Sequence, residues 1–243
     1  MQAFRSLLFS IGMIVSTIIV TVGSSFFVLF PFTLRSKLIR TYAVFNVWSL
    51  RVLCGVRYEV KGRENIPTEN FIIFSSHQST WETMALQLMF PPLSFVIKKE
   101  LLYVPFFGWA LAMLKPVAVK RGTGRFALKQ LIEKGIQRLK ENIVVIIFPE
   151  GTRIAPDVKV EYKRGGGILA EKSGYPVVPV AHNAGYYWPK RGFIKKPGLI
   201  TIHIGKPIPT KGRKAKEILN DAEAFIRSHI EPAHFDEYKS KAT

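Results

Sequence analysis

The sequence predicts an α/β fold: a mixed, largely parallel central sheet flanked by helices, preceded by an apolar helical membrane anchor. After residue 55, short runs of β-branched and aromatic residues alternate with segments whose apolar residues have helical spacing. Such alternation of strands and helices is typical of layered folds with a parallel sheet. Residues 143–147 are apolar throughout, which indicates a central strand buried on both faces.

The individual elements follow from these runs. The expected strands cover residues 56–60, 71–74, 94–97, 117–119, 143–148, 177–180 and 199–204. The expected helices cover residues 79–90, 101–114, 125–141, 166–173 and 211–230. The last helix is amphipathic, with these apolar residues on one face: Ile218, Leu219, Ala222, Phe225, Ile226 and Ile230.

The N-terminal segment predicts the membrane anchor. Residues 6–34 contain no charged side chain, whereas Arg35, Lys37 and Arg40 follow directly. This run exceeds the roughly 20 apolar residues that cross the hydrocarbon layer. A cleaved signal peptide would have a shorter apolar core and an Ala-x-Ala-like site, and no such site follows here. We therefore expect a retained anchor.

The form of the anchor stays open at this stage. A second apolar stretch, residues 42–56, is shorter and carries Arg51, while Pro31 could begin a turn between the two stretches. The anchor is either one spanning helix or a hairpin within one leaflet. We expect residues 1–55 to form the anchor and residues 56–243 to form the α/β domain. The basic excess after the first segment places this domain on the cytoplasmic side of a bacterial-type inner membrane.

Composition narrows the classes of partner. The 243 residues include 35 Lys and Arg against 17 Asp and Glu, giving a formal net charge of +18, and the mean hydropathy is +0.15. A chain that is both apolar and basic favours an anionic surface, either a membrane or a nucleic acid. With a single cysteine, Cys54, neither an internal disulfide nor a thiolate zinc site can form.

A polar loop after the strand at 71–74 holds the first chemical candidates. His77 and Glu82 lie five residues apart, so they can meet only if His77 precedes the helix and Glu82 occupies its first turn. Residues 79–82, Ser-Thr-Trp-Glu, fit a capping box, so Glu82 could simply cap the helix. Alternatively, Glu82 orients His77, which then takes a proton from a substrate hydroxyl. Ser75, Ser76 and Ser79 lie nearby, but none has the G-x-S-x-G context of a nucleophilic serine.

A second loop with polar and charged side chains follows the buried strand at 143–148. Residues 148–153, Phe-Pro-Glu-Gly-Thr-Arg, place Arg153 where its guanidinium can bind a phosphate and Gly151 where the backbone can approach a ligand. Read alone, this is a turn with an arginine. Ligands in open α/β sheets gather at such strand ends. Six basic residues add positive charge around other ends, although each could be a solvated surface charge: Lys98, Lys99, Lys120, Arg121, Lys163 and Arg164.

The two loops belong to an ordered set of motifs. Residues 77–82 resemble the H-x4-D block of the glycerolipid acyltransferases of the 1-acyl-glycerol-3-phosphate acyltransferase type, with Glu82 in place of the usual Asp. Residues 98–101, 104–109 and 119–121 resemble their second block, residues 148–153 their third, and residues 178–180 their fourth. The blocks come in family order between about residues 77 and 180, and the ordered set is specific.

This resemblance implies a function and residue roles. The family transfers a fatty acyl group from acyl-CoA or acyl-carrier protein to a lysophospholipid hydroxyl, and needs neither a metal nor a cofactor. His77 would be the general base and Glu82 its orienting carboxylate. Binding of the glycerol-phosphate head would fall to these residues: Arg121, Glu150, Gly151, Thr152 and Arg153, helped by Lys98 or Lys99. Backbone N–H groups near residues 150–152 are expected to stabilise the oxyanion.

The expected partners are membrane lipids, lysophosphatidic acid and the acyl donor. Residues 186–216 carry basic and aromatic residues without any acid, which suits an anionic leaflet, although a merely solubilising face would look the same. A membrane-tethered nucleic-acid binder would explain the charge but leave both loops without a role, so no nucleic-acid partner is expected. Transfer to another lysolipid or to glycerol-3-phosphate, and thioester hydrolysis, remain alternatives within the enzyme class.

Overall fold

The computed structural model describes residues 1–25, 29–120, 124–233 and 235. A seven-stranded sheet forms its centre, in the strand order β1-β7-β6-β2-β5-β3-β4. All neighbouring strands run parallel except β6 and β7, which are antiparallel. The strands are β1 (Val56–Lys61), β2 (Ile72–Ser75), β3 (Leu93–Lys98), β4 (Val117–Val119), β5 (Val144–Ile147), β6 (Val177–His182) and β7 (Gly198–Ile204). The predicted mixed, largely parallel sheet is therefore confirmed.

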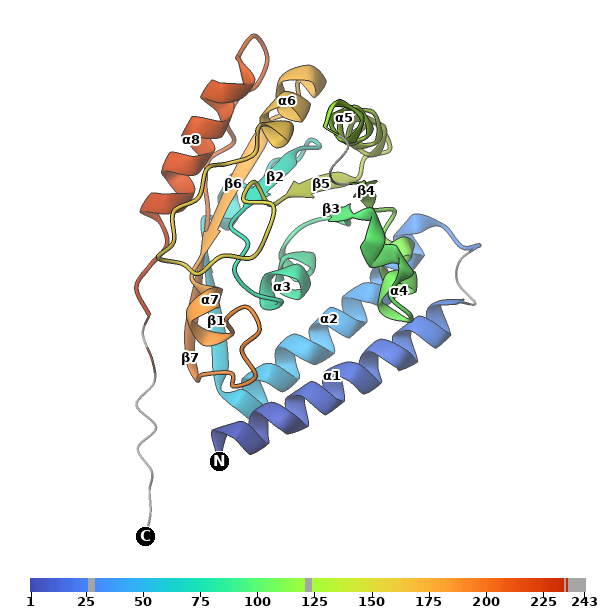
Figure 1. Cartoon of the computed structure of the whole chain (residues 1–243), viewed down its shortest axis with the longest axis vertical. Coiled ribbons are helices and arrows are strands. Elements are labelled where there is room, and N and C mark those ends of the chain that lie inside the picture. Colours follow the sequence, from blue (N-terminus) through green and yellow to red (C-terminus); the bar gives the residue numbers. More distant parts are fainter. Residues whose placement is uncertain (26–28, 121–123, 234, 236–243) are drawn as a thin grey trace.

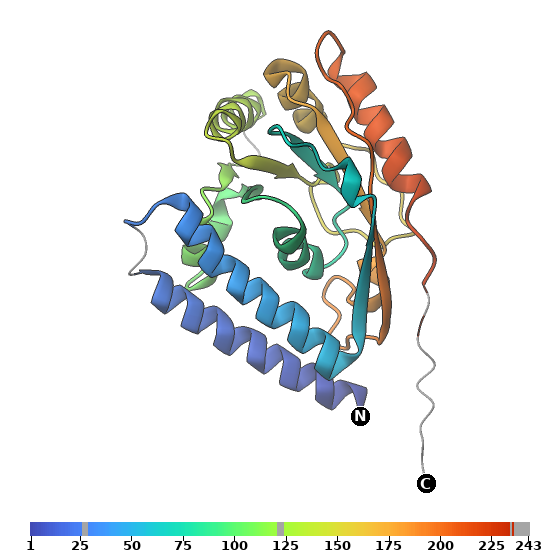
Figure 2. The same cartoon turned by 180° about the vertical axis from the view of Figure 1, so that it is seen from behind.

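Helices cover both faces of the sheet (Figures 1 and 2). One face carries α5 (Arg125–Lys140), α6 (Arg164–Ser173) and α8 (Ala215–Ser228). On the other face lie α1 (Gln2–Ser25), α2 (Phe32–Cys54), α3 (Trp81–Met89) and α4 (Phe107–Met113). Two hydrophobic cores result, one on each side, and every residue of β2, β5 and β6 is buried between them. Continuous apolar runs suit strands covered on both faces.

The amphipathic C-terminal helix forms as its spacing predicts. α8 buries Ile218, Leu219, Ala222 and Ile226 against the sheet and α6, while its charged face stays in solvent. The structure also has short elements between the main ones: the 3₁₀ turns η1 (Arg63–Asn65) and η2 (Lys99–Tyr103), and the one-turn helix α7 (Ala184–Tyr187).

The helix expected at residues 101–114 is broken into η2 and α4. Pro105 disfavours helical backbone in the preceding residue, and Val104 is extended. Phe106 has a positive φ of 60° and a ψ of −59°, and the Phe107 N–H donates to the Pro105 carbonyl at 2.7 Å. These values describe a γ-turn, which ends one helix and starts the next. The prediction of one continuous helix is therefore wrong at this turn.

The two N-terminal helices lie side by side in antiparallel directions (Figures 1 and 2). Gly55 ends α2 with a left-handed φ of 73°, a backbone conformation that favours glycine. α2 places Ile39, Ala43, Val47 and Leu50 in the same core as the sheet. The structure thus contains the helical hairpin, whereas its placement in a bilayer and a domain boundary at residue 55 stay predictions.

Candidate active site

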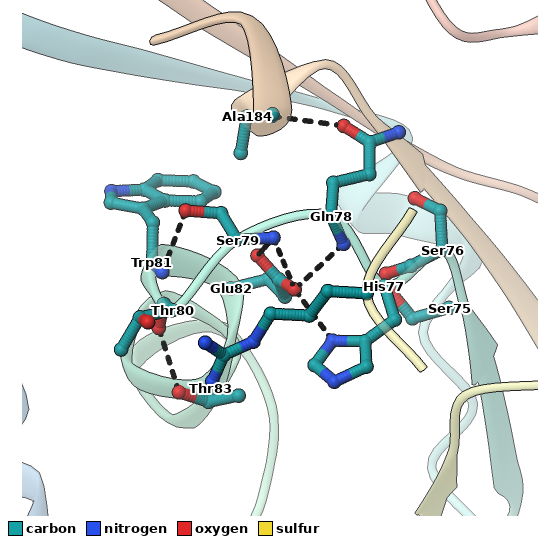
Figure 3. A network of polar contacts seen from close by, with 12 residues as sticks. Ser75, Ser76, His77, Gln78, Ser79, Thr80, Trp81, Glu82, Thr83 and Ala184 are labelled. Atoms are coloured by element: carbon teal, nitrogen blue, oxygen red, sulfur yellow. Dashed lines mark hydrogen bonds and ion pairs between the residues drawn. The ribbon is translucent and has the colours of Figure 1, made fainter. Parts of the chain in front are cut away.

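The first site loop leaves β2 and enters α3, and it brings His77 to Glu82 (Figure 3). The His77 Nδ1 lies 2.8 Å from Oε1 of Glu82. The extra methylene of glutamate, relative to the family's usual aspartate, does not prevent this contact. His77 lies before the helix and Glu82 in its first turn, the arrangement that the five-residue spacing requires.

The Glu82 carboxylate is fully buried and surrounded by N–H donors. Besides His77, the backbone N–H groups of Gln78 and Ser79 donate to it at 2.9–3.0 Å. Burial alone would raise the pKa of Glu82, but the hydrogen bond from His77, electrostatic interactions with His182 and His77, and the Ser79 N–H lower it overall. The two roles left open by the sequence coexist here, since one carboxylate contacts both the helix start and the imidazole.

The ionised carboxylate fixes the tautomer of His77. It accepts a hydrogen bond from Nδ1–H, which leaves the lone pair on Nε2, and this nitrogen points away from Glu82 (Figure 3). The ring stacks on Phe148, with centroids 4.1 Å apart and planes 17° apart, and its side chain is 17 % exposed. No described residue hydrogen-bonds Nε2. The imidazole is held as a base in the wall of a cavity.

That cavity has a volume of about 1280 Å³ and a mainly apolar wall. Its apolar lining comes from both helices of the hairpin and from α3, α4, α5 and β3, and it includes Val20, Ile39, Met84 and Leu128. His77 lies in its wall. Cationic side chains line the same cavity: Lys98, Arg153, Lys163, Arg164, Lys190 and Arg191. Such a space suits an apolar chain that carries an anionic head.

Most of the predicted binding residues meet at this cavity. Lys98, Gly151, Thr152 and Arg153 line it, whereas Lys99 is exposed at the start of η2 and is not part of the described wall. Gly151 has a φ of 68°, and a Cβ there would lie 2.6 Å from the Lys163 Nζ. Arg121 falls outside the described residues, so its role remains a prediction.

The third block meets the first because β2 and β5 are parallel neighbours, with Phe74 opposite Ile147. The Ile154 N–H donates to the His77 carbonyl at 2.8 Å, and the His77 N–H donates to Oε1 of Glu150 at 3.2 Å. The Gly151 N–H donates to the Phe148 carbonyl at 2.9 Å, so it stabilises the turn rather than an oxyanion. The turn after β5 therefore holds the backbone of His77 from both sides.

Glu150 lies behind the loop. Its side chain is buried at 5 % exposure and does not belong to the described wall of the large cavity. Burial raises the pKa of Glu150 to about 7, against weaker opposing effects of backbone hydrogen bonds, including that from His77. Its predicted contact with the glycerol-phosphate head remains a prediction.

Sequence reasoning missed several residues at this site. Lys163 and Arg164 were noted only as positive charge near a strand end, and Lys190 and Arg191 were not named, although the basic segment at 186–216 was a signal. His182 was missed as well. It is fully buried, donates from Nε2 to the Ser76 carbonyl at 2.9 Å and accepts the Ala184 N–H at Nδ1. It thereby links the loop that carries His77 to the start of α7.

Within the described part of the chain, no group of three or more His, Cys, Asp or Glu side chains could hold a metal ion. The described helices include one, spanning Gln2–Gly23 with a mean hydropathy of 2.1, that is long and apolar enough to cross a membrane.

Comparisons with known proteins bear on the family of this chain. A family model described as Acyltransferase matches residues 57–183. The 1-acyl-sn-glycerol-3-phosphate acyltransferase of Pseudomonas aeruginosa is 47% identical over 231 residues, which cover 93% of this chain and 90% of that protein. The enzyme of the same name from Saccharomyces cerevisiae is 32% identical over 72% of this chain and 59% of its own length.

A solved structure extends the likeness to the whole fold. The crystal structure of the 1-acyl-sn-glycerophosphate acyltransferase PlsC from Thermotoga maritima matches with a TM-score of 0.75 and 28% identity, covering 94% of this chain and 95% of that one. With nearly half of its residues identical to the Pseudomonas protein along almost its full length, the chain belongs to the 1-acyl-sn-glycerol-3-phosphate acyltransferase family.

Proposed function

We propose that this protein transfers a fatty acyl group from a thioester donor to the free hydroxyl of lysophosphatidic acid, giving phosphatidic acid. One observation carries the proposal: His77, whose Nε2 has no hydrogen-bond partner among the described residues, lies in the wall of a cavity that combines an apolar lining with cationic side chains. An acyl chain suits the apolar wall, and the phosphate of the acceptor suits Arg153 and its cationic neighbours.

The reaction follows from the orientation of His77. The acceptor hydroxyl attacks the thioester carbonyl carbon while Nε2 takes its proton, and Glu82 stabilises the resulting imidazolium. The tetrahedral intermediate then breaks its C–S bond, and the leaving thiolate receives the proton from His77. The products are an ester and a free thiol. Proton transfer to such a base contributes about 10²–10⁴ in rate, and orientation within the cavity supplies a further share.

The location of the protein belongs to the same proposal. One face of α1 exposes large apolar side chains, among them Leu8, Ile11, Val15 and Ile19, and basic residues follow in α2. This pattern supports association with a bacterial inner membrane, with the catalytic body on the cytoplasmic side. No metal or cofactor is needed, because the thioester is already activated.

The test is a thiol-release assay on the purified full-length protein in detergent. Acyl-CoA and acyl-carrier protein serve as donors, with lysophosphatidic acid, glycerol-3-phosphate and a lysophosphatidylcholine as alternative acceptors. We expect release only with lysophosphatidic acid, and its loss in His77→Ala. Release without any acceptor that persists in His77→Ala would refute the transferase assignment. A higher rate with another acceptor would move the proposal to that lipid.

A further inference from the structure

Two buried polar atoms behind the catalytic loop have no hydrogen-bond partner among the described residues. They are Oγ of Ser76 and Oε2 of Glu150. Ser76 is 2 % exposed and precedes the general base directly, while Glu150 accepts the His77 N–H through its other oxygen. An unpaired buried hydroxyl or carboxyl oxygen is costly, so such atoms normally have a partner.

Both residues line one small cavity, separate from the substrate cavity. It has a volume of about 30 Å³, and its wall also contains the polar residues Gln78, Tyr162 and Arg227. Neither Ser76 nor Glu150 belongs to the described wall of the large cavity, and His77 does not belong to that of the small one. A space of this size holds about one water molecule, and a buried water needs two to four polar partners.

We propose that this cavity binds a single structural water that bridges Ser76 Oγ and Glu150 Oε2, and that Glu150 is a positioning residue for His77 rather than a ligand of the acceptor head group. The proposal rests on the proposed function for its kinetic consequences only. The water satisfies both unpaired atoms. The carboxyl, held at Oε2 by the water, then fixes the His77 backbone through Oε1.

The position of this backbone matters because His77 has contacts on three sides. Its N–H is held by Glu150, its carbonyl by the Ile154 N–H and its ring by Glu82. Releasing the N–H lets the base move relative to the substrate hydroxyl. A displacement of about 1 Å can cost about 100-fold in rate, without changing how the acceptor head is bound.

Steady-state kinetics of the full-length protein in detergent separate positioning from head-group binding. Glu150→Ala should lower kcat about 100-fold and leave KM for the acceptor unchanged, whereas Arg153→Ala should raise that KM. Glu150→Gln keeps the acceptor oxygen for His77 and can donate to the water, so it should restore most of kcat. A rise in KM for Glu150→Ala comparable to that for Arg153→Ala would overturn the positioning role.

Ser76→Ala tests the water. It should lower kcat about threefold to tenfold, in line with the loss of one hydrogen bond. Ser75→Ala is the matched control, because Ser75 is buried one residue away, donates to the Ser76 carbonyl at 3.2 Å and lines neither cavity as described. Equal effects of the two changes would contradict the bridge.

A high-resolution crystal structure tests the site without any activity. We expect a density peak within hydrogen-bond distance of Ser76 Oγ and Glu150 Oε2 in the wild type, and a weaker or absent peak in Ser76→Ala. An empty cavity in the wild type would refute the water. If the wild type proves inactive toward lysophosphatidic acid, the proposed function fails, but the density peak still decides the water site.

Discussion

Every hydrogen bond that the structure gives the Glu82 carboxylate comes from an N–H donor, and this limits what residue 82 can be. A glutamine would turn an N–H₂ group either toward the Ser79 N–H or toward His77. In the second case the ring must accept at Nδ1 and carry its proton on Nε2, the wrong tautomer for a base. We therefore expect Glu82→Gln to lower kcat about 10²–10⁴-fold with little change in acceptor KM.

Glu82→Asp is the control for this change, because it keeps the charge and the acceptor oxygens. Its side chain is one methylene shorter, so the contact with His77 is weakened and some kcat is lost. Because the charge is retained, we expect this loss to be smaller than in Glu82→Gln. Steady-state kinetics at saturating acceptor measure both. Full activity of Glu82→Gln would show that the carboxylate only caps α3.

Glu150 predicts a pH-dependent stability. Its pKa is about 7 in the fold against 4.5 as the ordinary value, with burial as the main cause; Glu82 raises the pKa further and Arg227 lowers it. Between these values the folded protein holds a proton that the unfolded chain has released. The free energy of unfolding should therefore fall by about 3 kcal/mol as pH rises from about 4.5 to 7.

Glu150→Gln cannot lose this proton, so its melting temperature should rise relative to that of the wild type between these pH values. The buried His182, whose pKa burial lowers, adds the opposite slope below its ordinary value of 6.5, but it does so equally in both proteins. Thermal unfolding in detergent across pH 4.5–8 measures the difference. Parallel curves for the two proteins would contradict a protonated Glu150.

Whether the sequence predicts the role of a single residue depends on which side of a loop its side chain faces. The five-residue spacing of His77 and Glu82 predicts that they can meet, and they lie 2.8 Å apart. Spacing cannot tell, however, that Glu150 turns behind the loop while Arg153, three residues later, lines the cavity. These directions depend on the turn and on the contacts of the folded loop.

At the scale of elements, the strands were predictable because they are short runs rich in β-branched and aromatic residues, and β2, β5 and β6 are buried on both faces. β4, at Val117–Val119, coincides with its predicted range, and β5 differs by one residue at each end. The prediction of one helix at 101–114 was wrong because the apolar spacing continues through Pro105, whereas the helical backbone is interrupted there. α7 was missed because a single turn leaves no periodicity to detect.

The packing of α6 on α8 depends on Gly167. A Cβ at this residue would lie 2.5 Å from the Ala215 carbonyl oxygen, a backbone atom that opens α8. Gly165 in the same helix would meet the flexible Leu131 side chain instead. Alanine favours the helix equally at both sites, so we expect Gly167→Ala to be about 1–3 kcal/mol less stable than Gly165→Ala. Thermal unfolding of the two variants measures this, and equal melting temperatures would contradict the close packing.

Across the whole molecule, the N-terminal hairpin is a structural part of the catalytic body. Thr17 and Val20 of α1 and Ile39 and Tyr42 of α2 line the same cavity as His77. α1 also packs along α2 and α4. α1, which is long and apolar enough to cross a membrane, thus forms with α2 one wall of the space that we assign to the acyl chain. A lipid substrate would reach the base without leaving the neighbourhood of the bilayer.

Lys195 connects the start of α1 to the segment that precedes β7. It is 3 % exposed, and its Nζ donates to Ser10 Oγ and to the Phe193 carbonyl at 2.9 Å each. The Nζ also lies 5.1–5.5 Å from the ring centroids of three aromatic residues, Phe9, Trp188 and Phe193. Lys195→Met keeps the aliphatic stem but loses the charge and both hydrogen bonds. We expect about 2 kcal/mol of destabilisation and faster amide hydrogen exchange in the first half of α1.

Lys196→Met is the matched control, since Lys196 is exposed and contacts the Phe235 ring. Hydrogen exchange measured by mass spectrometry in detergent compares them. If both variants exchange alike in α1, the hairpin is held by its apolar packing, and the buried ammonium does not fasten it.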